Sequence, residues 1–143
     1  MVCTGNICRS PTMEAVFRRR AQEAGWPGVI DSAGTTSWHE GEPPDPRTIA
    51  VGEAAGYALA GLRARQVVAD DFVRFGLILA ADRTHFTWLR ERAPAEHRDK
   101  IRFFLPNDAD LPDPYYGNER DFLEVLRLVE HQGARWQGEI KGA

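Results

Sequence analysis

The first eleven residues of the chain combine a cysteine, an arginine and several small polar residues in one short stretch. The stretch CTGNICRSP (3–11) places Cys3 six positions before Arg9. A tight loop of this kind can aim successive backbone N–H groups at an anion, and a helix beginning directly after it adds its positive end. Arg9 can bind two phosphate oxygens with its planar guanidinium. The loop over 3–10 is therefore expected to hold a phosphate, with the Cys3 sulfur beneath the phosphorus.

The chemistry expected of this loop is nucleophilic attack by a thiolate. Helix N-termini and cationic neighbours lower the pKa of thiols to roughly 3.5–7.5. Gly5 permits backbone angles closed to other residues, and Asn6 tolerates the left-handed region. Ser10 can donate a hydrogen bond to the sulfur and stabilise it as a leaving group. The alternative is a buried, unreactive thiol at a strand end, which the neighbouring residues make less favoured.

A second motif, DPYYG (113–117), places a carboxylic acid beside two aromatic rings. An oxygen displaced from phosphorus leaves as an anion unless an acid protonates it, and Asp113 is the candidate acid. Tyr115 and Tyr116 could wall a slot for a flat ring. The alternative is a turn whose tyrosines cover the core. The same loop holds two rival acids without this aromatic setting, Asp108 and Asp110.

Strands and helices alternate along the chain as in an α/β domain. Helices are expected after capping groups at Ser10, Asp45 and Asp82, the first ending at Gly25, and along the apolar stripe of 122–129. Strands are expected at 29–30, 77–81 and 101–104, with loops over 34–46 and 105–118. This alternation implies a mainly parallel sheet covered on both faces, with functional sites at the carboxyl ends of its strands.

Length and composition limit the classes of protein that fit. The 143 residues suggest a single domain over 1–143. No apolar run is long enough to span a bilayer, and no signal peptide is evident, so membrane association is not expected. A net charge of −3 argues against nucleic-acid binding. Two cysteines without zinc-ligand spacing argue against a disulfide framework and against a structural metal. They predict a reducing, cytoplasmic compartment.

With both motifs in view, the chain resembles the low-molecular-weight protein tyrosine phosphatases. The similarity continues through DSAG (31–34), Trp38, DPR (45–47), ARQV (64–67) and ILAAD (78–82), so it covers nearly the whole chain. It implies a three-layer α/β/α fold around a four-stranded, mainly parallel sheet. It also implies phosphotyrosine hydrolysis without a metal or other cofactor. Cys3 would form a phosphocysteine, Arg9 would clamp the phosphate, and Asp113 would act as acid and then as base for water.

The resemblance assigns the remaining site residues as well. The phosphate-binding loop would comprise Thr4, Gly5, Asn6, Ile7, Cys8 and Ser10. Ser32 would support this loop together with Asn6 and Ser10. The substrate slot would be lined by Thr4, Ile7, Trp38, His39, Tyr115 and Tyr116. Cys8 matches a second cysteine that can form a reversible disulfide with the nucleophile under oxidation, although a packing role is equally compatible with its position.

Two departures from the family pattern stand out. Only Met1 and Val2 precede Cys3, whereas the family has a longer apolar strand in the centre of the sheet. The first strand is therefore expected to be truncated here or to start upstream, and a short central strand would lower stability. Some members carry a histidine that supports the loop at the position of Leu62.

Three other functions are compatible with this fold. A thioredoxin-coupled arsenate reductase needs further cysteines, and this chain has only Cys3 and Cys8. A protein-arginine phosphatase carries threonine in place of Ile7 and lacks the paired tyrosines. A phosphotyrosine-binding pseudophosphatase is favoured only by the short first strand. The implied partner is a phosphotyrosine protein, with a bacterial tyrosine kinase of polysaccharide export as a candidate.

The remaining charged side chains are interpreted as surface groups. The solvated helix faces would hold Glu14, Arg18, Arg19, Arg20, Glu91 and Arg92. Three histidines without metal partners are expected at the surface or at helix caps: His85, His97 and His131.

Overall fold

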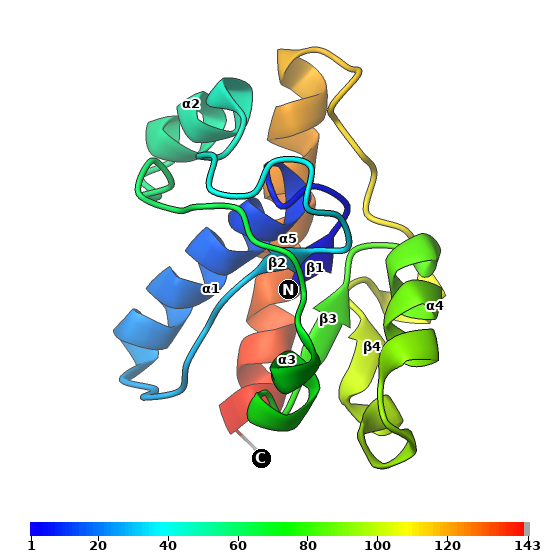
Figure 1. Cartoon of the computed structure of the whole chain (residues 1–143). Coiled ribbons are helices and arrows are strands. Elements are labelled where there is room, and N and C mark those ends of the chain that lie inside the picture. The colour runs from blue at the N-terminus through cyan, green and yellow to red at the C-terminus, as the bar shows by residue number, and fades with distance from the viewer. Residues whose placement is uncertain (142–143) are drawn as a thin grey trace.

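A sheet of four short parallel strands forms the centre of the computed structural model, which describes residues 1–141. The strands are β1 (Val2–Cys3), β2 (Ala33–Gly34), β3 (Ile78–Ala80) and β4 (Ile101–Phe103), in the order β2-β1-β3-β4. The helices are α1 (Arg9–Ala24), α2 (Pro46–Ala54), α3 (Ala69–Arg74), α4 (Arg83–Arg92) and α5 (Glu119–Lys141), with 3₁₀ turns at Ala95–Lys100 and Pro106–Asp108. The predicted α/β class and four-stranded parallel sheet are confirmed (Figure 1).

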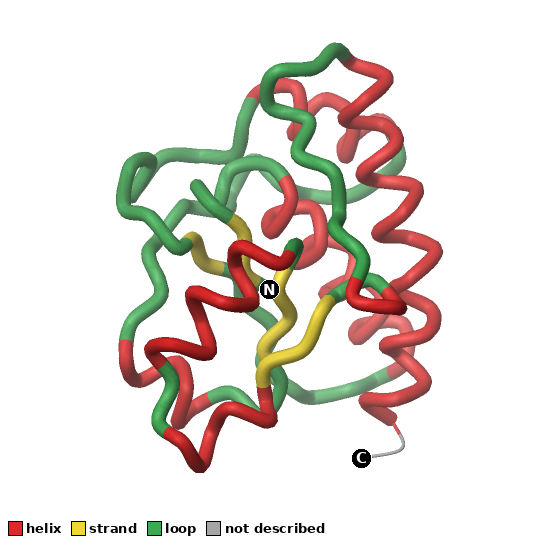
Figure 2. Tube along the Cα trace, turned by 90° about the vertical axis from the view of Figure 1, so that its right-hand side faces the viewer, coloured by secondary structure: helices red, strands yellow, loops and turns green. Residues whose placement is uncertain are grey.

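The sheet lies between two layers of helices because successive strand residues point to opposite faces. Leu79 packs into the cluster formed with α1 and α5, while its neighbours Ile78 and Ala80 pack against α3 and α4. Figure 2 shows the strands between these two sets of helices. The larger cluster is closed by Trp136 of α5, whose ring N–H donates to the carbonyl of Phe104 over 2.8 Å.

The predicted helix boundaries are mostly confirmed, because they depend on local groups. Gly25 ends α1 in the left-handed conformation, with φ of 67°. Asp45 accepts from the backbone of Arg47 at the start of α2. The prediction for Ser10 was wrong: Cys8 occupies the N-cap position of α1, and Ser10 lies inside the helix with its hydroxyl turned toward Cys3.

The first strand, β1, has two residues and still pairs with both neighbours. Val2 lies opposite Ala33 on one side and opposite Ala80 on the other. The predicted strand at Val29–Ile30 is absent, because β2 begins only where Val2 offers it a partner. A groove of about 550 Å³ continues the line of β1 beyond Met1. The expected effect of the short strand on stability stays a prediction.

The loop between β1 and α1, residues 3–10, is called the phosphate loop below. It lies at the carboxyl ends of the strands, the edge of a parallel sheet where functional sites are expected. The segment that precedes α2 and the segment that precedes α5 flank this edge (Figure 1). Within residues 1–141, no helix is long and apolar enough to cross a membrane.

Candidate active site

The backbone of the phosphate loop depends on close packing as well as on special angles. Asn6 adopts the predicted left-handed conformation, with φ of 58°. The prediction for Gly5 was wrong, because its φ is not in the left-handed region. Gly5 lies close to His39: a Cβ at Gly5 would lie 2.9 Å from the His39 ring, so a larger residue there would displace that ring. A Cβ on Gly34 would lie 2.6 Å from the carbonyl oxygen of Thr4, so β2 also approaches the loop closely.

The sulfur of Cys3 is buried and receives hydrogen bonds from the start of α1. Its Sγ lies 3.0 Å from Ser10 Oγ and accepts from the Ser10 backbone N–H over 3.4 Å. Asn6 Nδ2 donates to Ser10 Oγ over 2.7 Å, so the one Ser10 hydroxyl proton can go to the sulfur, at 3.0 Å, or to the Ala33 carbonyl, at 3.5 Å, and the sulfur is the nearer acceptor. Donors aimed at a sulfur favour its anionic form, the form that acts as a nucleophile.

A buried polar network holds Asn6 in place. Its Nδ2 donates to Ser32 Oγ over 2.9 Å, and its Oδ1 accepts from the backbone N–H of Arg65 over 3.0 Å. Ser32 Oγ donates in turn to Glu14 Oε1 over 2.6 Å. The structure thus brings Ser32 to the loop, as the resemblance implied, and adds Glu14, which the sequence analysis had left at the surface.

The prediction that Glu14 is solvated was wrong, since its exposed fraction is 3%. Its second carboxylate oxygen accepts from Arg18 Nε over 2.6 Å, so the buried charge is paired. One signal was present in the sequence: Glu14 follows Ser10 by four residues and therefore shares its helix face. With Glu14 and Ser32 in place, the network is connected without a histidine at the position of Leu62.

Arg9 is buried and held by acceptors on two sides. Its Nη1 donates to Asp82 Oδ2 over 2.8 Å and to the carbonyl of Leu111 over 2.9 Å. Its Nη2 lies 3.6 Å from Asp113 Oδ2. Burial by itself raises the pKa of Asp82, but contacts with His85 and Arg9 outweigh it and hold that pKa well below its usual range. Asp82 therefore stays anionic and positions the Arg9 guanidinium.

Asp113 lies beside Arg9 but remains accessible, with 48% of its side chain exposed. Its Oδ1 accepts from the backbone N–H of Tyr115 over 3.1 Å, and the intervening Pro114 is buried. The rival Asp110 is engaged elsewhere, since it accepts from the backbone of Arg83 over 2.9 Å. The structure thus brings Asp113 to the phosphate loop.

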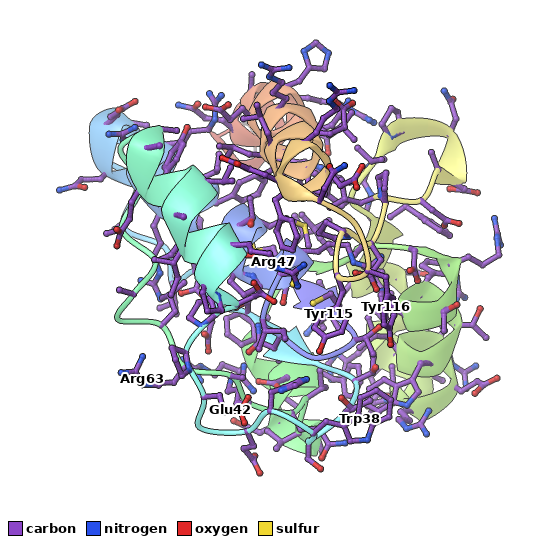
Figure 3. The ribbon with its side chains drawn as sticks, turned by 90° about the horizontal axis from the view of Figure 1, so that it is seen from above. Trp38, Glu42, Arg47, Arg63, Tyr115 and Tyr116 are labelled. Atoms are coloured by element: carbon purple, nitrogen blue, oxygen red, sulfur yellow. The ribbon has the colours of Figure 1, made fainter. Side chains whose placement is uncertain are left out.

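Figure 3 shows Tyr115 and Tyr116 beside each other, with Trp38 farther away in the same view. Tyr115 and Tyr116 meet edge to face at 4.9 Å, and Tyr116 is 94% exposed. Trp38, in the segment before α2, is also exposed. Arg47 Nη2 donates to the Tyr115 carbonyl over 3.0 Å, which ties the DPYYG turn to α2.

Two residues assigned to the slot have other contacts in the structure. Ile7 is buried and packs with Cys8, Ala64 and Phe122. Thr4 directs its hydroxyl to His85 over 2.7 Å. Their contribution to the slot stays a prediction. His39 lies against Gly5, and its Nδ1 is 2.7 Å from Glu42 Oε2.

The two cysteines of the loop differ in their surroundings. Both are free thiols. Burial raises the pKa of Cys8 to about 12. Cys8 therefore stays protonated near neutral pH, while the sulfur of Cys3 receives the donors from Ser10. The asymmetry favours Cys3 as the nucleophile.

Comparison with known proteins adds a family to this geometry. The model of a family described as "Low molecular weight phosphotyrosine protein phosphatase" matches residues 1–143. The chain belongs to this family. A low molecular weight protein-tyrosine-phosphatase of Streptomyces coelicolor is 49% identical over 140 residues, covering 90% of this chain and 84% of the relative.

Solved structures of phosphatases have the same fold. A protein tyrosine phosphatase from Entamoeba histolytica superposes with a TM-score of 0.92 at 35% identity, covering 99% of this chain and 94% of that one. The tyrosine phosphatase Wzb from Escherichia coli K30, solved in complex with sulphate, gives a TM-score of 0.85 at 30% identity, with 97% and 94% covered. The family resemblance found in the motifs is thereby confirmed.

Replacing Asp82 by Asn tests the electrostatic support of Arg9. We expect the free energy of unfolding to fall by about 2 kcal/mol near neutral pH, the size of a hydrogen bond between charged groups. Because the folded-state pKa of Asp82 is depressed, its stabilisation is complete above the unfolded value of about 3.9 and is lost as the pH falls through the folded pKa. Urea unfolding of both proteins at several pH values measures the difference.

The difference should be constant between about pH 7 and about pH 5 and should shrink only in stronger acid. A difference that already changes in the neutral range would show that another group, and not Asp82, carries the effect. Asp99→Asn, at an exposed position, is the control and should change stability by less than about 0.5 kcal/mol.

Proposed function

We propose that this chain hydrolyses phosphotyrosine in proteins through a phosphocysteine formed on Cys3. The observation that carries the proposal is the convergence of three groups on one loop: the hydrogen-bonded Cys3 sulfur, the buried Arg9 guanidinium and the accessible Asp113 carboxyl. They match the three needs of phosphoryl transfer, which are a nucleophile, a positive clamp and an acid. Membership of the phosphatase family supports the same reaction.

The first step is attack of the Cys3 thiolate on phosphorus, in line with the tyrosine oxygen. Arg9 and the backbone N–H groups of the phosphate loop stabilise the charge on the three remaining oxygens. Asp113 gives its proton to the leaving phenol oxygen, and its exposure leaves room for that oxygen beside it. The products of the step are free tyrosine hydroxyl and phosphocysteine.

The second step returns the enzyme to its starting state. Asp113, now a carboxylate, takes a proton from a water that attacks the phosphocysteine, and inorganic phosphate is released. The Cys3 sulfur leaves as a thiolate, and the hydrogen bonds from Ser10 stabilise that thiolate. In both steps, Arg9 and the backbone N–H groups of the phosphate loop stabilise the negative charge of the phosphate.

The aromatic mouth supports a flat phenyl substrate over an aliphatic one. Tyr115, Tyr116 and Trp38 offer ring faces and edges around the entrance. Two relatives of known structure are named Wzb, from Vibrio vulnificus and Escherichia coli. We therefore propose a phosphotyrosine protein as the substrate class and a bacterial tyrosine kinase as a candidate within it. The thiol chemistry suits a reducing, cytoplasmic compartment.

The other functions considered for this fold are less well supported. An arsenate reductase of the relay type needs a third cysteine, and the chain has two. A binding-only protein would not need the accessible acid at Asp113. A phosphoarginine substrate would not need the exposed rings of Tyr115 and Tyr116.

Cys3→Ser is the first test of the mechanism. We expect phosphate release from a phosphotyrosine peptide to fall below detection, because a serine hydroxyl in this site is not ionised near neutral pH. Release from phosphoserine and phosphoarginine peptides should be negligible for the unchanged chain as well. Malachite-green assays on the three peptides, with inorganic phosphate binding as the check on folding, measure this. Turnover by the Cys3→Ser protein would rule out the proposed nucleophile.

Asp113→Asn tests the acid. Aryl phosphates with poorly acidic phenols should be hydrolysed about 10²–10⁴-fold more slowly, while p-nitrophenyl phosphate, whose leaving group needs little protonation, should be affected far less. Asp110→Asn removes the rival acid and is the matched control. Equal slowing across the leaving groups would remove Asp113 from this role, and the same pattern in Asp110→Asn would transfer the role to Asp110.

A disulfide between Cys3 and Cys8 after peroxide treatment is the proposed redox reaction of the loop. The peroxide would convert Cys3 to a sulfenic acid, and Cys8 would then displace water from it. Because the pKa of Cys8 is raised to about 12, closure should be faster at higher pH. Activity regained on adding dithiothreitol, relative to each protein's starting activity, should be high for the unchanged chain and low for Cys8→Ser. Equal recovery would leave Cys8 with a packing role only.

A further inference from the structure

His85, in the first turn of α4, is a buried polar residue for which the proposed reaction has given no role. Its exposed fraction is 1%, so of the two predicted places, the surface or a helix cap, the surface was wrong, while its backbone N–H is capped by Asp82 at the start of α4. Its ring Nε2 lies 2.7 Å from Thr4 Oγ1, in the residue that follows the nucleophile. The two residues are 81 positions apart in the sequence, so the contact exists only in the folded chain.

Thr4 is held on two sides. Its side chain meets His85, while its carbonyl oxygen accepts from the backbone N–H of Thr36 over 3.1 Å and from the Thr36 hydroxyl over 3.0 Å. In a trans peptide the carbonyl and the next N–H point in opposite directions. Fixing the Thr4 carbonyl toward Thr36 therefore turns the N–H of Gly5 away from Thr36. His85 fixes the residue from which that peptide begins.

Asp82 joins this contact to the phosphate clamp. Its Oδ2 accepts from Arg9 over 2.8 Å, and its Oδ1 accepts from the backbone N–H of His85 over 3.1 Å. The ring Nδ1 of His85 also lies 3.0 Å from Oδ1, although it is poorly aligned for a hydrogen bond. The first turn of α4 thus contacts the guanidinium on one side and the start of the phosphate loop on the other.

We propose that His85 is a positioning residue, which aligns the start of the phosphate loop with Arg9 by linking Thr4 to the N-terminus of α4, where Asp82 holds the guanidinium. The inference rests on the proposed function, because it assigns His85 to the same reaction. His85 acts through Thr4 and does not contact the phosphate. Loop N–H groups stabilise the transition state only when they are aimed correctly, and small misplacements cost large factors in rate.

The test compares His85→Leu with His85→Gln. Leucine removes both ring nitrogens, whereas the glutamine amide can place a nitrogen near the position of Nε2 and contact Thr4 again. With p-nitrophenyl phosphate, we expect kcat of His85→Leu to fall at least about tenfold and by more than KM rises, because misplaced donors lose more in the transition state than in the bound ground state. His85→Gln should recover most of that kcat. His131→Leu, which removes an exposed histidine of α5, is the control and should match the unchanged chain.

Thr4→Val tests the same contact from the other side. If His85 acts through the Thr4 hydroxyl, the double variant Thr4→Val with His85→Leu should be no slower than the slower single variant. Rate losses that multiply, full kcat in His85→Leu, or failure of glutamine to restore it would overturn the proposal. Thermal unfolding of each variant shows whether a loss of rate comes from loss of folded protein. If leucine prevents folding, the single variants Thr4→Val and His85→Gln keep the test available.

Inorganic phosphate binding separates this inference from the proposed function. Calorimetry should show weaker phosphate binding by His85→Leu, by about threefold or more, and binding restored in His85→Gln. An unchanged chain that binds phosphate but does not turn over phosphotyrosine would overturn the proposed function. The positioning inference would then be decided by the phosphate affinities alone. Equal phosphate affinity in all three proteins would overturn the positioning role.

Discussion

The hydrogen bonds between Ser10 and the sulfur of Cys3 join the end of β1 to the start of α1, and they constrain both elements. Ser10 Oγ lies 3.0 Å from the sulfur and accepts from Asn6 Nδ2, so its own proton remains available to donate. Asn6 makes this contact from the left-handed conformation, with φ of 58°. The buried hydrogen bonds run from Asn6 to Ser32 and from Ser32 to the Glu14 carboxylate. Because that carboxylate can only accept, it fixes the Ser32 hydroxyl as the donor to it and as the acceptor from Asn6. Local backbone conformation and a distant carboxylate thus position the donors that face one sulfur.

The two carboxylates near Arg9 are suited to different tasks by their surroundings. Asp82 is held by Arg9 and by the first turn of α4, and its pKa is depressed, so it remains a fixed negative charge. Asp113 is half exposed and lies 3.6 Å from the guanidinium, which leaves it free to exchange a proton with substrate and water. Burial and hydrogen bonding thus make Asp82 a fixed support of the guanidinium and suit Asp113 to the acid role proposed for it.

The carboxyl end of β1, where the site lies, is paired on both sides, whereas a groove lies at its other end. The carboxyl end of β1 pairs with both neighbours through Val2 and Cys3, which is sufficient to place the phosphate loop. At the other end, the groove beyond Met1 lies between the segment before β2 and the start of β3. The phosphate loop and the groove thus lie at opposite ends of β1. The residues of β1 that pair with both neighbouring strands are those that support Cys3.

Features that depend on neighbours in sequence were determined by the sequence itself. Side chains within a few residues determine the turn at Asn6, the end of the helix at Gly25 and the helix cap at Asp45. The spacing of Cys3 and Arg9 indicated the reaction. The tertiary structure decided what distant segments share. Several features depend on which distant segment lies beside a residue. They are the burial of Glu14 and His85, the contact of Gly5 with His39, and the absence of a strand at Val29–Ile30. A carboxylate or an imidazole has no fixed preference for surface or core; its place depends on whether the fold supplies partners that compensate its burial.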